Sequence, residues 1–303
     1  MPHILYILFI TLSSMLFIAC GENDDILEGT ITPPFGGNSQ PSFGNVSNHP
    51  YTRRIEVPQL KEGNTFVYHA VKIGGDSIMN YCLEYDYTKY HSRWVAFRFD
   101  GNTRAKSVSR KDYSIKPQYP RDPKINPYYA LEDALYGSGY NHGHLVASDD
   151  RRYSREANDQ TFYMTNMSPQ KGDFNGGLWV EFEGQMQTRG RDRNFSDTLY
   201  ICKGGTIDHK DNIIKYVADG RMAVPKYYFM AAVAVKNGAY KGIAFWMEHK
   251  KYASSASTTS EMRKYALSID ALEAKTGINF FHNLPDRAEN AVEANYNVNE
   301  WIK

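Results

Sequence analysis

Two histidines separated by a single glycine, His142 and His144, are the first residues of this chain whose type and spacing suggest chemistry. A neutral imidazole can remove a proton from water near physiological pH, because histidine titrates at about 6.5. On a strand both rings lie on one face, a spacing that can also chelate zinc. A zinc hydrolase needs a third ligand, however, and neither Cys82 nor Cys202 is close in the sequence.

A second pair of polar residues follows, with Asn175 at the expected start of a helix and Glu183 eight positions later. At about 100° per residue this spacing returns to nearly the same helix face two turns on. Taken singly, an asparagine that opens a helix is more often a cap, and a lone glutamate is more often a solvated residue. The functional interpretation therefore depends on their order and spacing relative to His144.

These residues belong to two longer blocks of sequence. The blocks are 137–151, with Asn141-His142-Gly143-His144, and 162–183, with Thr165-Asn166-Met167-Ser168-Pro169-Gln170, Asn175, Trp179 and Glu183. Together they resemble the signature of the DNA/RNA non-specific endonucleases of the ββα-metal (His-Me finger) superfamily, which includes secreted sugar-non-specific nucleases and endonuclease G. That signature reads Asp-Arg-Gly-His, Thr-Asn-x-x-Pro-Gln and Asn-x-x-x-Trp, with a Glu four residues further on. Further matches at 93–97, 223–229 and 268–281 extend the resemblance over nearly the whole chain after residue 65.

The resemblance implies a role for each matched residue. His144 corresponds to the general base, and Asn175 to the asparagine whose amide oxygen binds one magnesium ion, for which manganese can substitute. Glu183 corresponds to a glutamate that accepts hydrogen bonds from metal-bound water. Magnesium suits a site with one protein ligand, because it dehydrates reluctantly and prefers oxygen ligands. The implied reaction is hydrolysis of DNA or RNA with little sequence preference, since contacts are mainly to the backbone.

The chain departs from the signature where Asn141-His142 replaces Asp-Arg. The family's arginine is implied to help bind the phosphate, and a histidine carries full charge only at low pH, so phosphate binding by His142 should be weaker. Arg110 is the candidate for a catalytic arginine upstream of the signature. Arg151 is a candidate for substrate binding, with a structural salt bridge as the equal alternative.

The start of the chain is not expected to belong to the fold. Residues 4–19 form an apolar run of signal-peptide length, too short for a comfortable membrane span, and they end in a segment that resembles a bacterial lipoprotein cleavage site. We therefore expect a lipoprotein-type signal peptide at residues 1–19, and a lipidated Cys20 that anchors an exported protein at the cell envelope or surface. A plain secretory signal is the alternative, because Phe17 stands where Leu or Val is usual and the first residues carry no Lys or Arg.

Two expectations follow for the mature chain. Residues 20–50 combine an acidic patch with a stretch rich in Pro, Gly, Asn and Ser, which predicts a flexible tether. Lipidation of Cys20 leaves Cys82 and Cys202, an even pair in an oxidising compartment. A disulfide and two buried thiols both remain open for this pair.

The rest of the sequence predicts a single α+β domain at 51–303 with antiparallel sheets, to which the resemblance adds a ββα-metal motif. Alternating strand-like segments occur at 65–71, 81–87 and 94–99, and a further strand is expected at 161–165. Residues 103–140 are irregular and predict a long surface connection. The net charge is +1, so any phosphate-binding surface must be local.

One competing interpretation is not an enzyme. Loss of the signature arginine is also typical of a catalytically weakened member that binds nucleic acid or a surface partner without cutting. Retention of His144, Asn175 and Glu183 argues against this, because a site that no longer cuts has no chemical need for all three.

Overall fold

The computed structural model describes residues 49–303, and its main element is a seven-stranded sheet in which all neighbouring strands are antiparallel. In sheet order the strands are β1 (Thr65–Ile73), β2 (Asp76–Asp86), β3 (His91–Phe99), β6 (Thr198–Gly205), β9 (Tyr227–Lys236), β10 (Ala239–Glu248) and β11 (Ala266–Leu267). The first three predicted strands fall in β1, β2 and β3, so the α+β class with antiparallel sheets is confirmed. The expected signal peptide, Cys20 and most of the expected tether lie outside the described residues and stay predictions.

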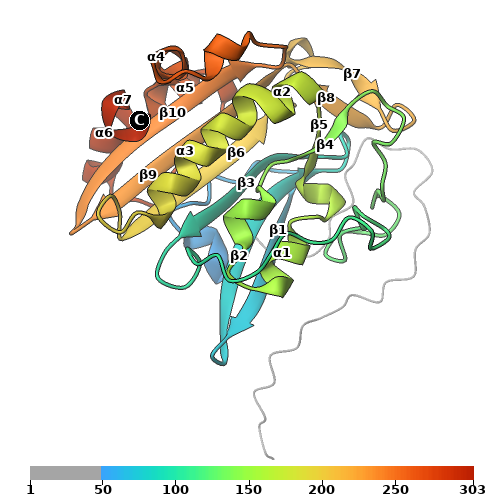
Figure 1. Cartoon of the computed structure of the whole chain (residues 1–303), viewed down its shortest axis with the longest axis horizontal. Coiled ribbons are helices and arrows are strands. Elements are labelled where there is room, and N and C mark those ends of the chain that lie inside the picture. Colours follow the sequence, from blue (N-terminus) through green and yellow to red (C-terminus); the bar gives the residue numbers. More distant parts are fainter. Residues whose placement is uncertain (1–48) are drawn as a thin grey trace, which may run out of the picture. The chain divides into compact units, whose positions relative to one another are not determined.

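Helix α3 (Val180–Arg191) covers one face of this sheet (Figure 1). Alternate side chains of a strand point to opposite faces, and Phe97 and Phe99 of β3 point toward α3. They share a buried core with Phe182 and Met186 of the helix. The sheet and α3 therefore hold each other in place through a large aromatic contact.

The opposite face is covered by α5 (Ile269–Thr276) and α6 (Asp286–Ala294). Trp94, which alternates with Phe97 and Phe99 along β3, packs there in a second core with Leu272 and Val292. Other regular elements are α1 (Arg155–Gln160), β7 (Ile213–Val217), β8 (Met222–Pro225), α4 (Thr259–Met262) and α7 (Val298–Trp301). Among residues 49–303, no helix has the length and apolar character needed to cross a bilayer.

Cys82 and Cys202 lie in this second core as free, fully buried thiols. Burial raises the pKa of both thiols well above the usual value, because it disfavours the charged thiolate. The structure therefore resolves the alternative that the sequence left open in favour of two packed thiols.

The motif residues lie on a short hairpin followed by a helix. Strand β4 (Asn141–His144) pairs with β5 (Met167–Gln170), and the chain then continues through α2 (Gly172–Phe174) and the segment Asn175–Trp179 into α3. A Cβ atom at Gly143 would lie 2.2 Å from Oε1 of the buried Gln170, so the Gln170 side chain packs directly on this glycine and would have to move to admit a larger residue. This is the strand–strand–helix arrangement that the resemblance implied.

The strand expected at 161–165 is not formed, and that prediction is wrong. A turn and a 3₁₀ helix at Met164–Asn166 occupy this position, and β5 begins only at Met167. The cause is the buried side chain of Asn166, which accepts a hydrogen bond from Val146 N at 2.8 Å and donates to Val146 O at 2.9 Å. A side-chain amide thus replaces strand pairing at this point.

Residues 103–140 contain no helix or strand, as predicted, but they are anchored to the rest of the structure. The buried Asp122 carboxylate contacts Nε2 of His69 at 3.0 Å and also accepts a hydrogen bond from the Thr165 hydroxyl. Tyr119 and Leu135 of the connection pack in a buried cluster beside β4 and β5. This connection therefore forms a wall next to the motif and is not a detached loop.

Two glycines of α3 provide a test of how closely the helix packs on the sheet. A Cβ atom at Gly190 would lie 2.4 Å from Cγ of the buried Phe99, whereas one at Gly184 has nothing within 4 Å. We expect Gly190→Ala to lower the free energy of unfolding by about 1–3 kcal/mol through overpacking. Gly184→Ala should raise it by about 0.5–1 kcal/mol, because alanine is the better helix former. Urea unfolding measures both values, and equal effects would contradict this packing.

Candidate active site

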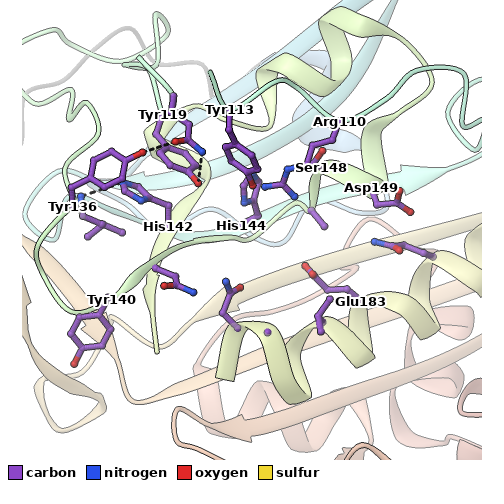
Figure 2. A pocket seen from close by; sticks show the side chains of 18 of the residues that line it. Arg110, Tyr113, Tyr119, Tyr136, Tyr140, His142, His144, Ser148, Asp149 and Glu183 are labelled. Carbon is purple, nitrogen blue, oxygen red and sulfur yellow. Dashed lines mark hydrogen bonds between the residues drawn. The ribbon is translucent and has the colours of Figure 1, made fainter. Parts of the chain in front are cut away.

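A pocket of about 590 Å³ lies between β4, the irregular connection and the start of α3 (Figure 2). Five of the six residues singled out in the sequence line it, namely Arg110, His142, His144, Asn175 and Glu183. They come from three separate parts of the chain. The pocket therefore brings together most of the residues that the sequence predicts for catalysis.

His144 ends β4 at the wall of this pocket and is 9% exposed. Its ring packs edge-to-face against Phe162, with the ring centroids 4.9 Å apart. The Nε2 atom is buried and has no hydrogen-bond partner within the described part of the chain. A buried polar atom without a partner is unusual and indicates a group that waits for a ligand or water.

The surroundings of His144 hold its ring in the neutral form. Burial lowers the pKa of His144 well below its usual value, and the positive charges of Arg110 and Lys203 lower it further. A neutral imidazole is the form that accepts a proton. The geometry therefore fits a base more closely than a cationic phosphate ligand.

Asn175 also lines the pocket and is the first residue of the distorted helical segment Asn175–Trp179. This segment is a π-helical turn with a kink at Gly177, so the regular helix expected between Asn175 and Glu183 is interrupted. π-turns of this kind are frequent at functional sites. Within residues 49–303 the Asn175 side chain has no hydrogen-bond partner, so its amide oxygen is available to a ligand.

Glu183 projects from α3 and is held by a buried lysine that the sequence analysis missed. The Lys203 ammonium lies 3.2 Å from Oε1 of Glu183 and 3.0 Å from Oδ2 of Asp150. Lys203 and Asp150 have no exposed surface. Burial raises the pKa of the Glu183 carboxyl, and the Lys203 charge opposes that shift. The sequence offered one signal for this ion pair, because Lys203 is the one charged residue in the strand Thr198–Gly205.

His142 pairs opposite Pro169 in the hairpin, and its ring stacks on Tyr119 with centroids 3.8 Å apart and planes 6° apart. Its Nε2 accepts a hydrogen bond from Leu135 N at 3.2 Å. Burial lowers the pKa of His142 to about 4. The residue that replaces the signature arginine is therefore uncharged at neutral pH.

The two arginine candidates have different places. Arg110 lines the pocket, with its guanidinium carbon 4.6 Å from the centre of the Tyr113 ring. Arg151 does not line it and has no exposed surface. Its guanidinium lies over the rings of Phe97 and Phe99 and donates to Arg98 O at 2.9 Å. The structure thus places Arg151 in the core, out of reach of a substrate in the pocket.

The pocket fits a hydrated oxygen-ligated ion better than zinc. Across residues 49–303, the groups of three His, Cys, Asp or Glu side chains close enough to share an ion do not include His142 or His144. A zinc site would need such a third ligand. The asparagine amide and the glutamate carboxylate in this pocket suit magnesium better. Magnesium retains several waters, and the carboxylate can accept hydrogen bonds from them.

The known proteins that resemble this chain are nucleases. The profile of the DNA/RNA non-specific endonuclease family matches residues 62–287. Mitochondrial nuclease EXOG of Mus musculus is 27% identical over 216 residues, which cover 68% of this chain and 56% of the mouse protein. A nuclease of Nostoc sp. is 26% identical over 226 residues, covering 71% and 75%. Mitochondrial endonuclease G of Caenorhabditis elegans is 29% identical over 220 residues, covering 69% and 68%.

The fold has a solved counterpart as well. A chain from the crystal structure of the EndoG/EndoGI complex superposes with a TM-score of 0.59 at 21% identity, covering 73% of this chain and 89% of that one. At this identity the likeness concerns the fold. The present chain spans little more than half the length of the EXOG proteins that it matches.

The titration of His144 can be followed directly. We expect the midpoint of its ring Cε1 proton, observed by NMR, to lie well below pH 6.5, because burial and Arg110 disfavour the charged ring. Arg110→Gln should move the midpoint to higher pH, since one positive charge is removed. Arg121→Gln, at an exposed arginine outside this pocket, should leave it unchanged. A wild-type midpoint at or above 6.5 would contradict the described environment.

Proposed function

Since the chain belongs to the DNA/RNA non-specific endonuclease family, we propose that it is a metal-dependent nuclease that hydrolyses the backbone of DNA, RNA or both with little sequence preference. One observation carries this proposal. The unpartnered Nε2 of His144 and the free amide of Asn175 line one pocket, and Figure 2 shows His144 across that pocket from Glu183. A phosphate between them would meet a base on one side and a metal ligand on the other.

The neutral His144 ring takes the proton from the attacking water. Its Nε2 needs no rearrangement for this, because no protein group occupies it. A hydrated magnesium ion on the Asn175 amide oxygen, or manganese in its place, would supply positive charge to the phosphate and the departing 3′ oxygen. Because activity requires the neutral ring, it persists down to the pKa of His144 and is lost as the pH falls below that value.

Glu183 and Arg110 complete the site. The carboxylate of Glu183 keeps a fixed position, since Lys203 holds one of its oxygens at 3.2 Å, and it accepts hydrogen bonds from water in the pocket. The guanidinium of Arg110 binds the phosphate, and it is the arginine at the pocket that can replace the charge absent from His142. A guanidinium suits this task, because it keeps its charge and presents several donors.

A second candidate function is binding without cleavage. It is favoured by the neutral state of His142, which leaves the signature position without the charge that the family's arginine carries. In that case His144 and Asn175 would be retained without being used. Incubation of the purified protein with DNA and RNA in magnesium, with and without chelator, separates the two candidates.

Substitution of the base and of the metal ligand tests the proposed roles. We expect His144→Ala to lower the cleavage rate of plasmid DNA and of RNA by about 10²–10⁴-fold while the protein stays folded at the assay temperature, because general-base catalysis contributes that much. His209→Ala, at an exposed histidine outside the pocket, is the matched control and should cut normally. Asn175→Ala should move the magnesium titration to higher concentration. Rates within tenfold of wild type for His144→Ala would remove it from the role of base.

We also propose that the protein is exported and held at the cell envelope or surface by lipid on Cys20. The support is the apolar run at 4–19 and the residues that precede the cysteine. Mass spectrometry of the mature protein should find an N-terminus at Cys20 carrying lipid, and Cys20→Ser should move the protein from the membrane fraction. An unmodified N-terminus in the soluble exported fraction would favour the plain secretory signal.

A further inference from the structure

Tyrosines form much of the pocket wall around the proposed catalytic residues. Tyr113, Tyr119, Tyr136 and Tyr140 all line it, and all come from the irregular stretch before β4 (Figure 2). Tyr113 is 43% exposed and Tyr136 is 56% exposed, which is high for such large rings. The rings of Tyr113 and Tyr136 therefore face solvent at the pocket, whereas Tyr119 is buried and Tyr140 is partly buried beside it.

Three of these rings each have a positive charge beside them. The guanidinium carbon of Arg110 lies 4.6 Å from the centre of the Tyr113 ring. Nζ of Lys116 lies 5.7 Å from the centre of the Tyr136 ring, and Nζ of Lys215 lies 5.0 Å from the centre of the Tyr140 ring. No carboxylate within residues 49–303 forms an ion pair with any of the three cations. The tyrosine wall thus contains three pairs of a flat ring and a cation that could contact a ligand.

The replacement of the signature arginine belongs to the same arrangement. The flat ring of His142 stacks on Tyr119, and Gln118 links Tyr119 to Tyr136. Gln118 donates to the Tyr119 hydroxyl at 3.3 Å and accepts from the Tyr136 hydroxyl at 2.6 Å. A histidine at 142 therefore supports the tyrosine wall, at a position where the imidazole is neutral.

Rings beside positive charges are suited to nucleotides whose bases are not paired. A base can stack on an aromatic face while a neighbouring cation contacts its phosphate, and every base has such a face, so the contact is independent of sequence. In a duplex the faces are already stacked on one another, and a protein meets mainly the backbone and the base edges. Tyrosine rings at the pocket wall therefore contribute little to binding of a duplex.

We propose that Tyr113, Tyr136 and Tyr140, each with its cation, are base-stacking subsites, so that the pocket takes single-stranded or locally unpaired nucleic acid. This inference rests on the proposed nuclease function and adds the class of substrate. In Figure 2 Tyr136 and Tyr140 lie toward one end of the pocket, and Arg110 and Glu183 toward the other. The bound strand follows this direction, and the phosphate to be cut lies at His144.

Binding separates this inference from catalysis. The His144→Ala protein, in magnesium, is titrated with a fluorescent single-stranded oligonucleotide and with the blunt duplex of the same sequence. We expect the single strand to bind at least tenfold more tightly. Tyr113→Ala, Tyr136→Ala and Tyr140→Ala should each weaken single-strand binding by about fivefold to a hundredfold. Tyr113→Phe, Tyr136→Phe and Tyr140→Phe should bind within about threefold of the parent, since they keep the ring, and duplex binding should change less than twofold.

Tyr216 provides the matched control. It is 40% exposed and has Lys89 Nζ 5.9 Å from its ring centre, but it does not line the pocket. Tyr216→Ala should leave single-strand binding unchanged. Equal losses for single strand and duplex, tighter binding of the duplex, or a loss for Tyr216→Ala as large as those at the pocket would each overturn the inference. If the wild type cuts neither substrate while the binding pattern holds, the nuclease proposal fails and the stacking subsites stand.

Discussion

A single buried ammonium group, that of Lys203, relates the two walls of the pocket to each other. A buried charge is expensive unless it is paired, and Lys203 meets Asp150 and Glu183 at 3.0 and 3.2 Å. Asp150 follows β4 closely and also accepts a hydrogen bond from Ala147 N at 2.9 Å. Glu183 belongs to α3, which begins just after the segment of Asn175. Displacing either wall would leave a buried charge without its partner, so this contact with β6 helps to fix the distance between the proposed base and the proposed metal ligand.

Local patterns in the sequence predicted the parts of the structure that local physics determines. The alternation of apolar and polar side chains predicted β1, β2 and β3. The order and spacing of the motif residues predicted that His144, Asn175 and Glu183 share one site, and all three line one pocket. The strand expected at 161–165 failed, because one buried asparagine side chain competes with strand pairing there. Nothing in a window of a few residues carries that information.

Contacts between distant parts of the chain were out of reach for the same reason. Lys203 contacts Asp150 and Glu183 because the fold brings β6 next to both residues. The distances between these three residues along the sequence do not predict that contact. Arg151 was a candidate for substrate binding by its position after the motif, yet the rings of Phe97 and Phe99 hold it in the core. The π-turn at Asn175–Trp179 likewise follows from how the chain enters α3, and regular helix geometry did not predict it.

The low pKa of His144 raises a question about its strength as a base, because a ring that resists protonation also accepts protons less readily. Under the proposed function, the bound substrate would change the pKa of His144. Arg110 is one of the charges that lower the pKa of His144, and each phosphodiester brings a negative charge to the same pocket. A phosphate bound by Arg110 offsets that positive charge and favours the protonated ring. In the proposed mechanism, His144 is thus neutral while the pocket is free and gains basicity once a backbone is bound beside Arg110.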